Sequence, residues 1–409
     1  MATDAVAERV RTFYERHPYP PPVEGLEGYR RQGQDRERRR ADHHLFWPAR
    51  AYRETATLLI AGCGTSQAAR YAMRWPATRV IGIDVSATSV RCTEELKRRY
   101  DLANLEIHQL PIEKVGELGA SFDRIICTGV LHHLADPDAG LAALREVLEP
   151  DGAMHLMVYA PHGRTGVYML QEFCRRLGIQ ANDDEIGGLM TALRALPPGH
   201  PLQPLLREAP DFQDASALAD ALLHPCDRPY SVPELFDFLD RARLAFGRWL
   251  RQGPYSPRCG VLARLPQRER LARLPAREQY AAVELFRGTM ARHSLIVYRD
   301  FDHAAAQRLD FASDACSGYV PMRASDTICV RERLPPGAAA VLINSAHTCT
   351  DIILPIDASE LELFEAIDGR RTVGEIARPP GRLKAARAFF ERLHQHDQVV
   401  FDTSGGPPR

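Results

Sequence analysis

Short apolar runs alternate with amphipathic segments between Thr57 and Tyr159. Short apolar runs bounded by turn residues are typical of buried strands, and apolar residues spaced three or four apart are typical of helices. Their alternation predicts βαβ units and a parallel sheet in a doubly wound, Rossmann-like α/β fold. Strands are expected at Thr57–Ala61, Arg79–Ile83, Leu105–Gln109, Phe122–Cys127 and Ala153–Tyr159, and helices at Ser66–Arg74, Ser86–Tyr100 and Pro137–Leu148. The last helix is expected to end at a turn, Pro150-Asp151-Gly152.

The alternation stops after Tyr159. Residues 162–227 contain helical pieces and several prolines, and we interpret them as a helical insertion. Ser231 and Glu234 then have the spacing of a capping box, which predicts the start of a helix. A strand at Leu244–Trp249 is expected to complete the sheet. The main domain is therefore predicted to span residues 57–265, after an N-terminal segment at 1–56.

The last part of the chain has a different pattern. Residues 266–337 form an accessory region in this interpretation, with a strand expected at Ser294–Arg299, and Pro335-Pro336-Gly337 marks a boundary. Residues 338–404 follow as a small α+β unit with a winged-helix-like order. Its strands are expected at Ala339–Asn344, Asp351–Ile356 and Gln398–Phe401, and its helices around Leu361–Ile367, at Thr372–Ala377 and at Leu383–His394.

Composition and charge exclude several classes of protein. With 45% hydrophobic and 26% charged residues, the chain has the composition of a globular protein, and no apolar run is long enough to span a bilayer. The first residues, MATDAVAERV, carry charges where a signal peptide would be apolar, and the nine cysteines form no CxxC pair, so we expect a cytoplasmic protein. The net charge of -1 disfavours nucleic acid as a partner.

The chemistry is expected where the first two strands end. Gly62 and Gly64 follow the first strand, and residues without a Cβ allow a sharp turn and the close approach of a ligand. Asp84 ends the next strand, where a carboxylate can accept hydrogen bonds from both hydroxyls of a ribose. A dinucleotide is disfavoured, because Gln67 replaces the third glycine of the G-x-G-x-x-G fingerprint.

Four motifs in this order resemble class I S-adenosylmethionine-dependent methyltransferases: GCGTS, VIGIDVS, FDRIICTGVLHHLADP and LREVLEPDGAMHLMVY. The HPYP, LFWP and GVLHHLADP phrases are most similar to a bacterial group of these enzymes. The resemblance implies a seven-stranded sheet, S-adenosylmethionine as cofactor, a methionine end lined by Ala61, Gly62, Cys63 and Gly64, a ribose held at Asp84 and Val85, and a wall beside the methyl group that begins with Thr128 and Gly129.

Two positions depart from this family's pattern. Ser66 stands where the family has a third glycine, which should be tolerated if the φ angle of Ser66 is negative. The acidic residue that the family often places near adenine is replaced by Pro111. Adenine is then expected to contact Gln109 or the backbone near Leu110.

A methyl acceptor that loses a proton needs a base near the fourth strand. His132 and His133 come just after that strand, and imidazole exchanges protons near neutral pH, so both are candidate catalytic residues. Alternatively, one histidine caps a turn and the other packs in the interior. No metal site is predicted, because no cysteine lies at ligand spacing from this pair.

The acceptor itself is left open as a small molecule or a side chain of a peptide or protein. The resemblance implies that the N-terminal helical segment is a lid, so Tyr14 and Tyr19 are candidate substrate contacts. Arg287 could bind an anionic group, although salt bridges between accessory elements are the favoured interpretation of Arg287, Arg292 and His293. The terminal unit resembles peptide-binding winged helices and could instead make a homodimer. The competing functions are a catalytically silent cofactor-binding or interaction module and a nucleic-acid methyltransferase.

Overall fold

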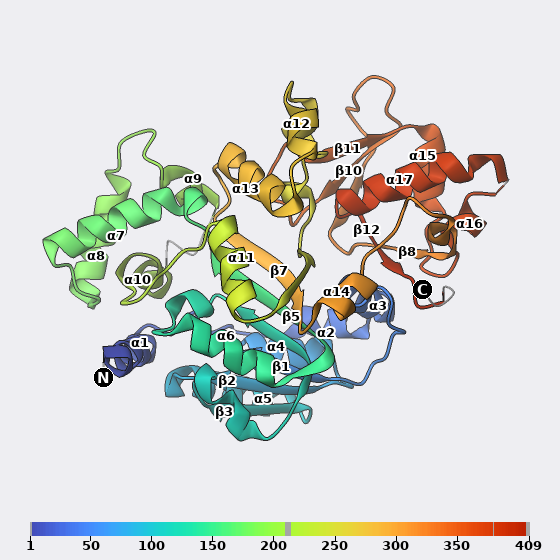
Figure 1. Cartoon of the computed structure of the whole chain (residues 1–409). Coiled ribbons are helices and arrows are strands. Elements are labelled where there is room, and N and C mark those ends of the chain that lie inside the picture. The colour runs from blue at the N-terminus through green and yellow to red at the C-terminus, as the bar shows by residue number, and fades with distance from the viewer. Residues whose placement is uncertain (1, 209–213, 379, 406–409) are drawn as a thin grey trace. The chain divides into compact units, whose positions relative to one another are not determined.

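A seven-stranded sheet is the main feature of the computed structural model of this 409-residue chain, which describes residues 2–208, 214–378 and 380–405 (Figure 1). Its strand order is β3-β2-β1-β4-β5-β7-β6. The strands are β1 Thr57–Ala61, β2 Arg79–Asp84, β3 Leu105–Gln109, β4 Phe122–Thr128, β5 Leu148–Tyr159, β6 Ala245–Trp249 and β7 Arg292–Tyr298.

The first five strands are parallel, as the sequence predicted. Such strands need crossover connections, and three helices supply them: α4 Gln67–Arg74, α5 Ala87–Tyr100 and α6 Pro137–Glu146. Strands β6 and β7 pair antiparallel. The prediction of a doubly wound, seven-stranded Rossmann-like sheet is confirmed. The ends of β1, β2, β3 and β4 therefore lie at one edge, where a ligand is expected.

Strand β5 begins earlier than predicted. The turn expected at Pro150-Asp151-Gly152 lies within the strand, and Ala153 is not its first residue. Leu148 pairs with Phe122, but Ala153 pairs with Arg124, so the register shifts between these two pairs. The turn residues therefore lie within β5, as an irregularity in its pairing with β4. The local sequence pattern of such an irregularity does not differ from that of a loop.

The seventh strand comes from a region that was predicted to be accessory. The strand expected at Ser294–Arg299 is present as β7, and it occupies the position between β5 and β6 in the sheet. The sheet is therefore not complete at residue 265, where the predicted main domain ends. Strand pairing across a long connection depends on tertiary contacts, and the periodicity of β7 alone does not specify its neighbours.

The chain forms two compact units that differ from the predicted boundaries. The first contains Met1–Gly33, Glu54–Leu244 and Glu284–Ser294, and the second contains Gln34–Arg53, Ala245–Val283 and Leu295–Arg409. The segment predicted as one N-terminal lid, residues 1–56, is divided between them. Its helices are α1 Ala2–Arg16 and α2 Glu27–Gln34, followed by α3 Arg36–Phe46.

The predicted insertion is helical in the first unit. It contains α7 Thr165–Leu177, α8 Asp183–Arg194, α9 Gln203–Glu208 and α10 Ala215–Leu223, and residues 209–213 lie outside the described part. Val167, Leu170, Leu189 and Leu218 belong to a buried cluster that these helices share with Phe13 of α1. Helix α11, Val232–Arg241, then begins at the predicted capping box, where the Ser231 N–H donates to the Glu234 carboxylate at 2.9 Å.

The second unit contains the predicted α+β elements and two further strands. The three-stranded sheet has the order β11-β10-β9, and β12 pairs with β8. Strands β8 and β9 lie in the region that was predicted to be accessory. Their partners, β12 and β10, lie in the predicted terminal unit, so the predicted boundary separates strands that pair with each other. The elements are α12 Arg268–Ala272, α13 Ala276–Arg287, α14 Phe301–Ala306, β8 Val320–Arg323, β9 Thr327–Val330, β10 Ala340–Asn344, β11 Ile353–Ile356, α15 Ala358–Glu365, α16 Val373–Ile376, α17 Leu383–Gln395 and β12 Val399–Asp402.

None of the helices in the described ranges has both the length and the apolar character that crossing a membrane requires.

Candidate active site

The loop between β1 and α4 has the backbone that the glycine pattern predicted. Gly62 and Gly64 have φ angles of +72° and +55°, a conformation that favours glycine. A Cβ on Gly62 would lie 2.4 Å from a methyl carbon of Val130. The N–H groups of Gly62 and Cys63 both donate to the Ile83 carbonyl at 2.9 Å, which fixes the loop against β2. The loop therefore has neither room nor conformational freedom for a larger residue at Gly62.

Asp84 lies beside this loop at the end of β2. Its two carboxylate oxygens accept hydrogen bonds from the Gly64 N–H at 2.8 Å and the Ser86 N–H at 2.9 Å. Burial raises the pKa of Asp84, and the bonds from Ser86 and Gly64 act in the opposite direction. A carboxylate oxygen has more than one lone pair, so each oxygen can still accept a bond from a ligand hydroxyl. The structure thus brings Asp84 and the glycine loop together.

The predicted adenine residues lie at the adjacent strand end. The Leu110 N–H donates to the Asp84 carbonyl at 2.9 Å, and the exposed Gln109 side chain donates to the Val85 carbonyl at 3.2 Å. These contacts place Val85, Gln109 and Leu110 at the edge of the sheet that holds Asp84. Their roles toward a ligand stay predictions.

The end of β4 closes the other side of the loop. The Gln67 amide donates to the Thr128 hydroxyl at 2.9 Å, and Gly129 follows with a φ angle of +80°. Gln67 stands where a dinucleotide fingerprint needs its third glycine, and its side chain crosses to β4 instead. Ser66 has a φ angle of -158°, so serine replaces the family's glycine there without left-handed backbone.

Residues 10–20, the N-terminal arm, pack directly on the glycine loop between β1 and α4. A Cβ on Gly64 would lie 2.9 Å from the Tyr19 carbonyl oxygen, and the Thr65 hydroxyl donates to the Pro20 carbonyl at 2.7 Å. The Ser86 hydroxyl donates to the Tyr14 carbonyl at 3.3 Å. The arm thus covers the loop that was predicted to bind the cofactor, as the position of a lid requires.

Glu15 fastens this arm to α5. Its carboxylate accepts bonds from the Ala87 N–H at 2.7 Å, the Thr88 N–H at 3.1 Å and the Thr88 hydroxyl at 2.7 Å. Burial acts to raise the pKa of Glu15, but the bonds from Thr88 and Ala87 outweigh it and hold the pKa below its ordinary value. An anion at the N-terminus of a helix is stabilised by the helix dipole. The attachment is therefore strongest when Glu15 is ionised, and it weakens as the pH falls through the lowered pKa.

Glu15→Gln is expected to loosen the arm by about 0.5 to 1 kcal/mol, the usual contribution of a charge at a helix N-terminus. Amide exchange of residues 10–20 and of Ala87 and Thr88, measured by mass spectrometry, should become faster. Glu8→Gln is the matched control, because Glu8 is an exposed residue of α1 that pairs only locally, with Arg11. Equal exchange in the two variants would contradict the role of Glu15.

His133 has a fixed ring orientation. Its Nδ1 atom lies 2.8 Å from the Cys226 carbonyl oxygen. A carbonyl can only accept, so Nδ1 carries the hydrogen and Nε2 of a neutral ring keeps its lone pair. The side chain is almost fully buried, at 2% exposure. His133 therefore presents a proton acceptor inside the protein.

His132 differs from its neighbour. It is fully buried, and neither of its ring nitrogens has a hydrogen-bond partner among the described residues. Burial lowers the pKa of His132 well below its ordinary value, and the nearby His133 and Arg164 lower it further. Its ring packs on the ring of Tyr159 with a centroid distance of 4.0 Å. His132 is thus a neutral side chain, and both of its ring nitrogens are available to hydrogen-bond with a ligand.

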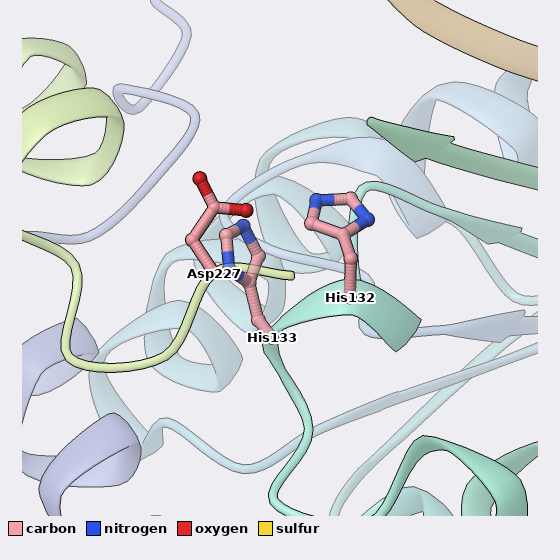
Figure 2. A group of neighbouring side chains, drawn as sticks. All are labelled: His132, His133 and Asp227. Atoms are coloured by element: carbon pink, nitrogen blue, oxygen red, sulfur yellow. The ribbon is translucent and has the colours of Figure 1, made fainter. Parts of the chain in front are cut away.

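Side chains from the insertion surround the two histidines. The Tyr14 hydroxyl donates to Asp220 at 2.9 Å, and the His224 ring lies against that of His133, tilted by 39° with a centroid distance of 3.9 Å. Figure 2 shows His132 and His133 on one short helical turn, with the Asp227 carboxylate from a separate segment beside the His133 ring. The insertion therefore supplies two buried carboxylates to the pocket that the sequence assigned to the histidines alone.

Two groups of these side chains have the composition of metal ligands: His132, His133 and Asp227 in one group, and His133, Asp220 and His224 in the other. In each, the ligand atoms lie within 4.8 Å of one another. However, the Nδ1 atom of His224 accepts the Cys226 N–H at 3.0 Å, so Nε2 of a neutral ring is protonated and cannot bind a metal. Asp227 already has a cation beside it, because an Arg164 nitrogen lies 3.8 Å from its carboxylate. This chemistry fits a polar organic ligand better than a metal ion.

The roles predicted for Arg287 and His293 stay predictions. Arg287 ends α13 and is half-buried. His293 lies 3.0 Å from Glu284, and both side chains are buried. Glu284 also accepts the Val232 N–H at 2.8 Å, so this pair anchors the start of α11.

The sequence interpretation missed Arg164, Asp220, His224 and Asp227. A signal was present, because Asp220 stands within the apolar helix ALADALL, where a carboxylate needs a partner. The partner, Tyr14, lies about two hundred residues away along the chain, at a separation of 206 positions. Without a fold, the pairing could not be predicted.

Comparison with known proteins identifies part of the chain. Residues 59–156 match the family described as methyltransferase domain. An uncharacterized protein of Synechococcus sp. is 31% identical over 251 residues, which cover 59% of this chain and 60% of that protein. A tRNA U34 carboxymethyltransferase of Shewanella amazonensis is 37% identical over 102 residues, or 24% of this chain and 30% of that enzyme. The chain thus spans less than two thirds of the length of these relatives.

A solved structure resembles almost the whole chain. PKMT2 from Rickettsia typhi, determined in complex with AdoHcy, aligns with a TM-score of 0.62 and covers 94% of this chain and 77% of that one. The two sequences are 14% identical, so the likeness concerns the fold. The family match identifies residues 59–156 as similar to a methyltransferase domain, and the solved structure shares the fold of the predicted Rossmann-like sheet. They do not concern the predicted winged helix.

Proposed function

We propose that the chain is an S-adenosylmethionine-dependent methyltransferase acting on a small molecule or on a side chain of a peptide or protein, since residues 59–156 match the methyltransferase domain family. The observation that carries the proposal is the contact between Asp84 and the glycine loop, where the Gly64 N–H donates to the carboxylate at 2.8 Å. The contact sets the carboxylate oxygens of Asp84 beside a glycine loop whose backbone a ligand can approach closely, which suits a ribose next to a methionine chain.

When bound, S-adenosylmethionine supplies an activated methyl group, which is displaced from sulfur as the bond to the acceptor forms, while sulfur keeps the electron pair. The residues of the chain hold and align the reactants. Ala61, Gly62, Cys63 and Gly64 line the methionine end, Asp84 and Val85 hold the ribose, Gln109 and Leu110 face adenine, and Thr128 and Gly129 bound the methyl side. The N-terminal arm keeps water out.

His133 is the base in this proposal. Its Nε2 lone pair takes the proton of the acceptor, and the Cys226 carbonyl holds the ring through Nδ1 at 2.8 Å. The protonated ring is stabilised by Asp220, which belongs to the same cluster. His132 contacts the acceptor through its unpaired nitrogens. Tyr14 positions Asp220 through their hydrogen bond of 2.9 Å, and Tyr19 and Arg287 stay candidate substrate contacts.

Two other functions compete with this one. A catalytically silent cofactor-binding module would not need a buried base beside the methyl side. A nucleic-acid methyltransferase has the tRNA-modifying relative in its favour, but the near-neutral charge of the chain and the sequence Thr128-Gly129-Val130-Leu131, in place of an (N/D)PPY motif, disfavour it. A cytoplasmic location and a homodimer are also part of the proposal.

The test is methyl transfer from tritiated S-adenosylmethionine to a cell lysate separated into small-molecule, protein and nucleic-acid fractions. We expect label in the small-molecule or the protein fraction. Calorimetry with S-adenosylhomocysteine checks the cofactor site independently of the acceptor. Label in nucleic acid alone would favour the competing enzyme, and binding without label in any fraction would favour the silent module.

A further inference from the structure

Arg164 is buried with one edge of its guanidinium unpaired. Its exposure is 6%, and its Cζ atom lies 3.6 Å above the centre of the Tyr159 ring. Neither Nε nor Nη2 has a hydrogen-bond partner in the described part of the chain. Leaving a buried donor unpaired costs about 1 to 3 kcal/mol, and more for a charged group. The arrangement is therefore explained by a ligand that pairs with these two atoms.

The edge formed by Nε and Nη2 is the one that binds carboxylates elsewhere in this protein. Arg79 donates from these two atoms to Glu106 at 2.7 and 2.9 Å, and Arg175 does so to Glu172 at 2.7 Å for each bond. Both of those pairs lie at the surface. A guanidinium edge matches two oxygens of one planar group, which makes the contact specific for a carboxylate. Arg164 offers the same fork in the interior, where the nearest carboxylate, that of Asp227, lies 3.8 Å from Nη2 and makes no hydrogen bond to it.

Asp227 lies next to this fork with an unpaired oxygen. Its Oδ2 atom accepts the Gln171 amide at 2.9 Å and lies 3.8 Å from Arg164 Nη2, too far for a hydrogen bond. Its Oδ1 atom has no partner in the described residues, and its side chain is 3% exposed. Two donor atoms of Arg164 and one acceptor atom of Asp227 thus lie near each other without hydrogen-bond partners among the described residues.

Charge limits what can enter such a pocket. Arg164 and Asp227 carry opposite charges, and the neighbouring buried carboxylate of Asp220 is paired separately, with the Tyr14 hydroxyl at 2.9 Å. A carboxylate alone would add a negative charge beside Asp227, and an ammonium alone would add a positive charge beside Arg164. Burying a net charge is costly, whereas a group with adjacent ammonium and carboxylate adds none. Such a zwitterion also supplies the partners that both side chains lack.

We infer that Arg164 and Asp227 form a subsite for the α-amino-acid group of a free small molecule, which is the methyl acceptor. The carboxylate lies on Nε and Nη2 of Arg164, and the ammonium donates to Oδ1 of Asp227. The ring of Tyr159 connects this subsite to the histidines, because it packs on Arg164 on one side and contacts His132 at 4.0 Å. The inference rests on the proposed function and decides between its two acceptor classes, since a side chain within a protein has no free amino-acid group.

The test uses the full chain, tritiated S-adenosylmethionine and three portions of one small-molecule extract. The first portion is untreated, the second has its carboxylates converted to methylamides, and the third has its amines acetylated. Label is expected in the untreated portion and at least tenfold less in the methylamide portion. The acetylated portion is also expected to lose label, because the ammonium is recognised as well.

Substitutions test whether Arg164 and Asp227 recognise the carboxylate and the ammonium of the acceptor. Arg164→Lys keeps the charge but removes the fork, and kcat/KM for the untreated extract is expected to fall about 10- to 100-fold, as for the loss of one or two charged hydrogen bonds. Asp227→Asn is expected to give a fall of similar size. Arg175→Lys is the matched control, since Arg175 is an exposed arginine of the same helix region, and its kcat/KM should stay within about twofold of the wild type.

The outcomes separate this inference from the proposed function. Equal label in the untreated and methylamide portions would overturn the amino-acid subsite, as would label confined to protein or nucleic acid. Equal label in the two portions, or label confined to protein, would leave the methyltransferase proposal intact. Label confined to nucleic acid would overturn its acceptor class as well. Absence of label from every fraction would overturn the proposed function and the inference with it. If Arg164→Lys does not fold, as judged by its melting and its affinity for S-adenosylhomocysteine, the chemical treatments still decide with the wild-type protein.

Discussion

Asp84→Ala is expected to lower the affinity for S-adenosylhomocysteine about 10- to 100-fold, because the ligand loses one or two charged hydrogen bonds worth about 1 to 3 kcal/mol. The carboxylate also accepts the Gly64 N–H at 2.8 Å and the Ser86 N–H at 2.9 Å. Its removal therefore weakens the glycine loop as well as the ribose contact. Isothermal titration calorimetry measures the combined effect.

Two further variants separate these contributions. Asp84→Asn keeps the size of the side chain and one carbonyl oxygen, so we expect a smaller loss than with alanine. Glu95→Ala is the control, because Glu95 is an exposed acidic residue on α5, and its affinity for S-adenosylhomocysteine should equal that of the wild type. An unchanged affinity in Asp84→Ala would remove the main support for the cofactor site.

The first half of the sheet could be predicted because its signals are local. Strands β1 and β2 are short apolar runs that are each followed by a helix, and the start of α5 is marked by Ser86, whose side chain accepts the Ser89 N–H. Crossover connections of this length leave little choice of partner. The position of β7 could not be predicted in the same way, since it joins the sheet after an intervening helical region.

The cofactor half of the site could be predicted for a related reason. Gly62, Gly64 and Asp84 each end or follow a predicted strand, and the ends of adjacent parallel strands meet at one edge. Their spacing along the chain therefore fixes their proximity. The left-handed φ angles of both glycines agree with this interpretation.

The acceptor half could not be predicted, because it is assembled from distant helices. Asp220, His224 and Asp227 come from the end of the insertion, and Tyr14 comes from α1. Each of these residues is an isolated polar position in its own segment, and no periodicity relates one to another. Only the packing of α10 and α7 brings them to His133, through contacts such as the Gln171 amide bond to Asp227 at 2.9 Å.

His133→Asn is expected to lower kcat by about 10²- to 10⁴-fold, the usual contribution of a general base. Asparagine can still donate to the Cys226 carbonyl, which His133 binds at 2.8 Å, but it cannot take a proton. The affinity for S-adenosylhomocysteine should stay the same, because His133 lies on the acceptor side of the pocket. Single-turnover methyl transfer to the labelled fraction measures the rate of the chemical step.

His132→Asn is the comparison that separates a base from a packed side chain. Since His132 is fully buried without a hydrogen-bond partner in the described residues, we expect its replacement to weaken acceptor binding and raise KM more than it lowers kcat. Added imidazole should restore part of the rate to His133→Asn and none to His132→Asn, because only the first variant lacks a proton acceptor. If imidazole restores neither variant and both lose equal activity, the two histidines act only through packing, and the base belongs elsewhere in the pocket.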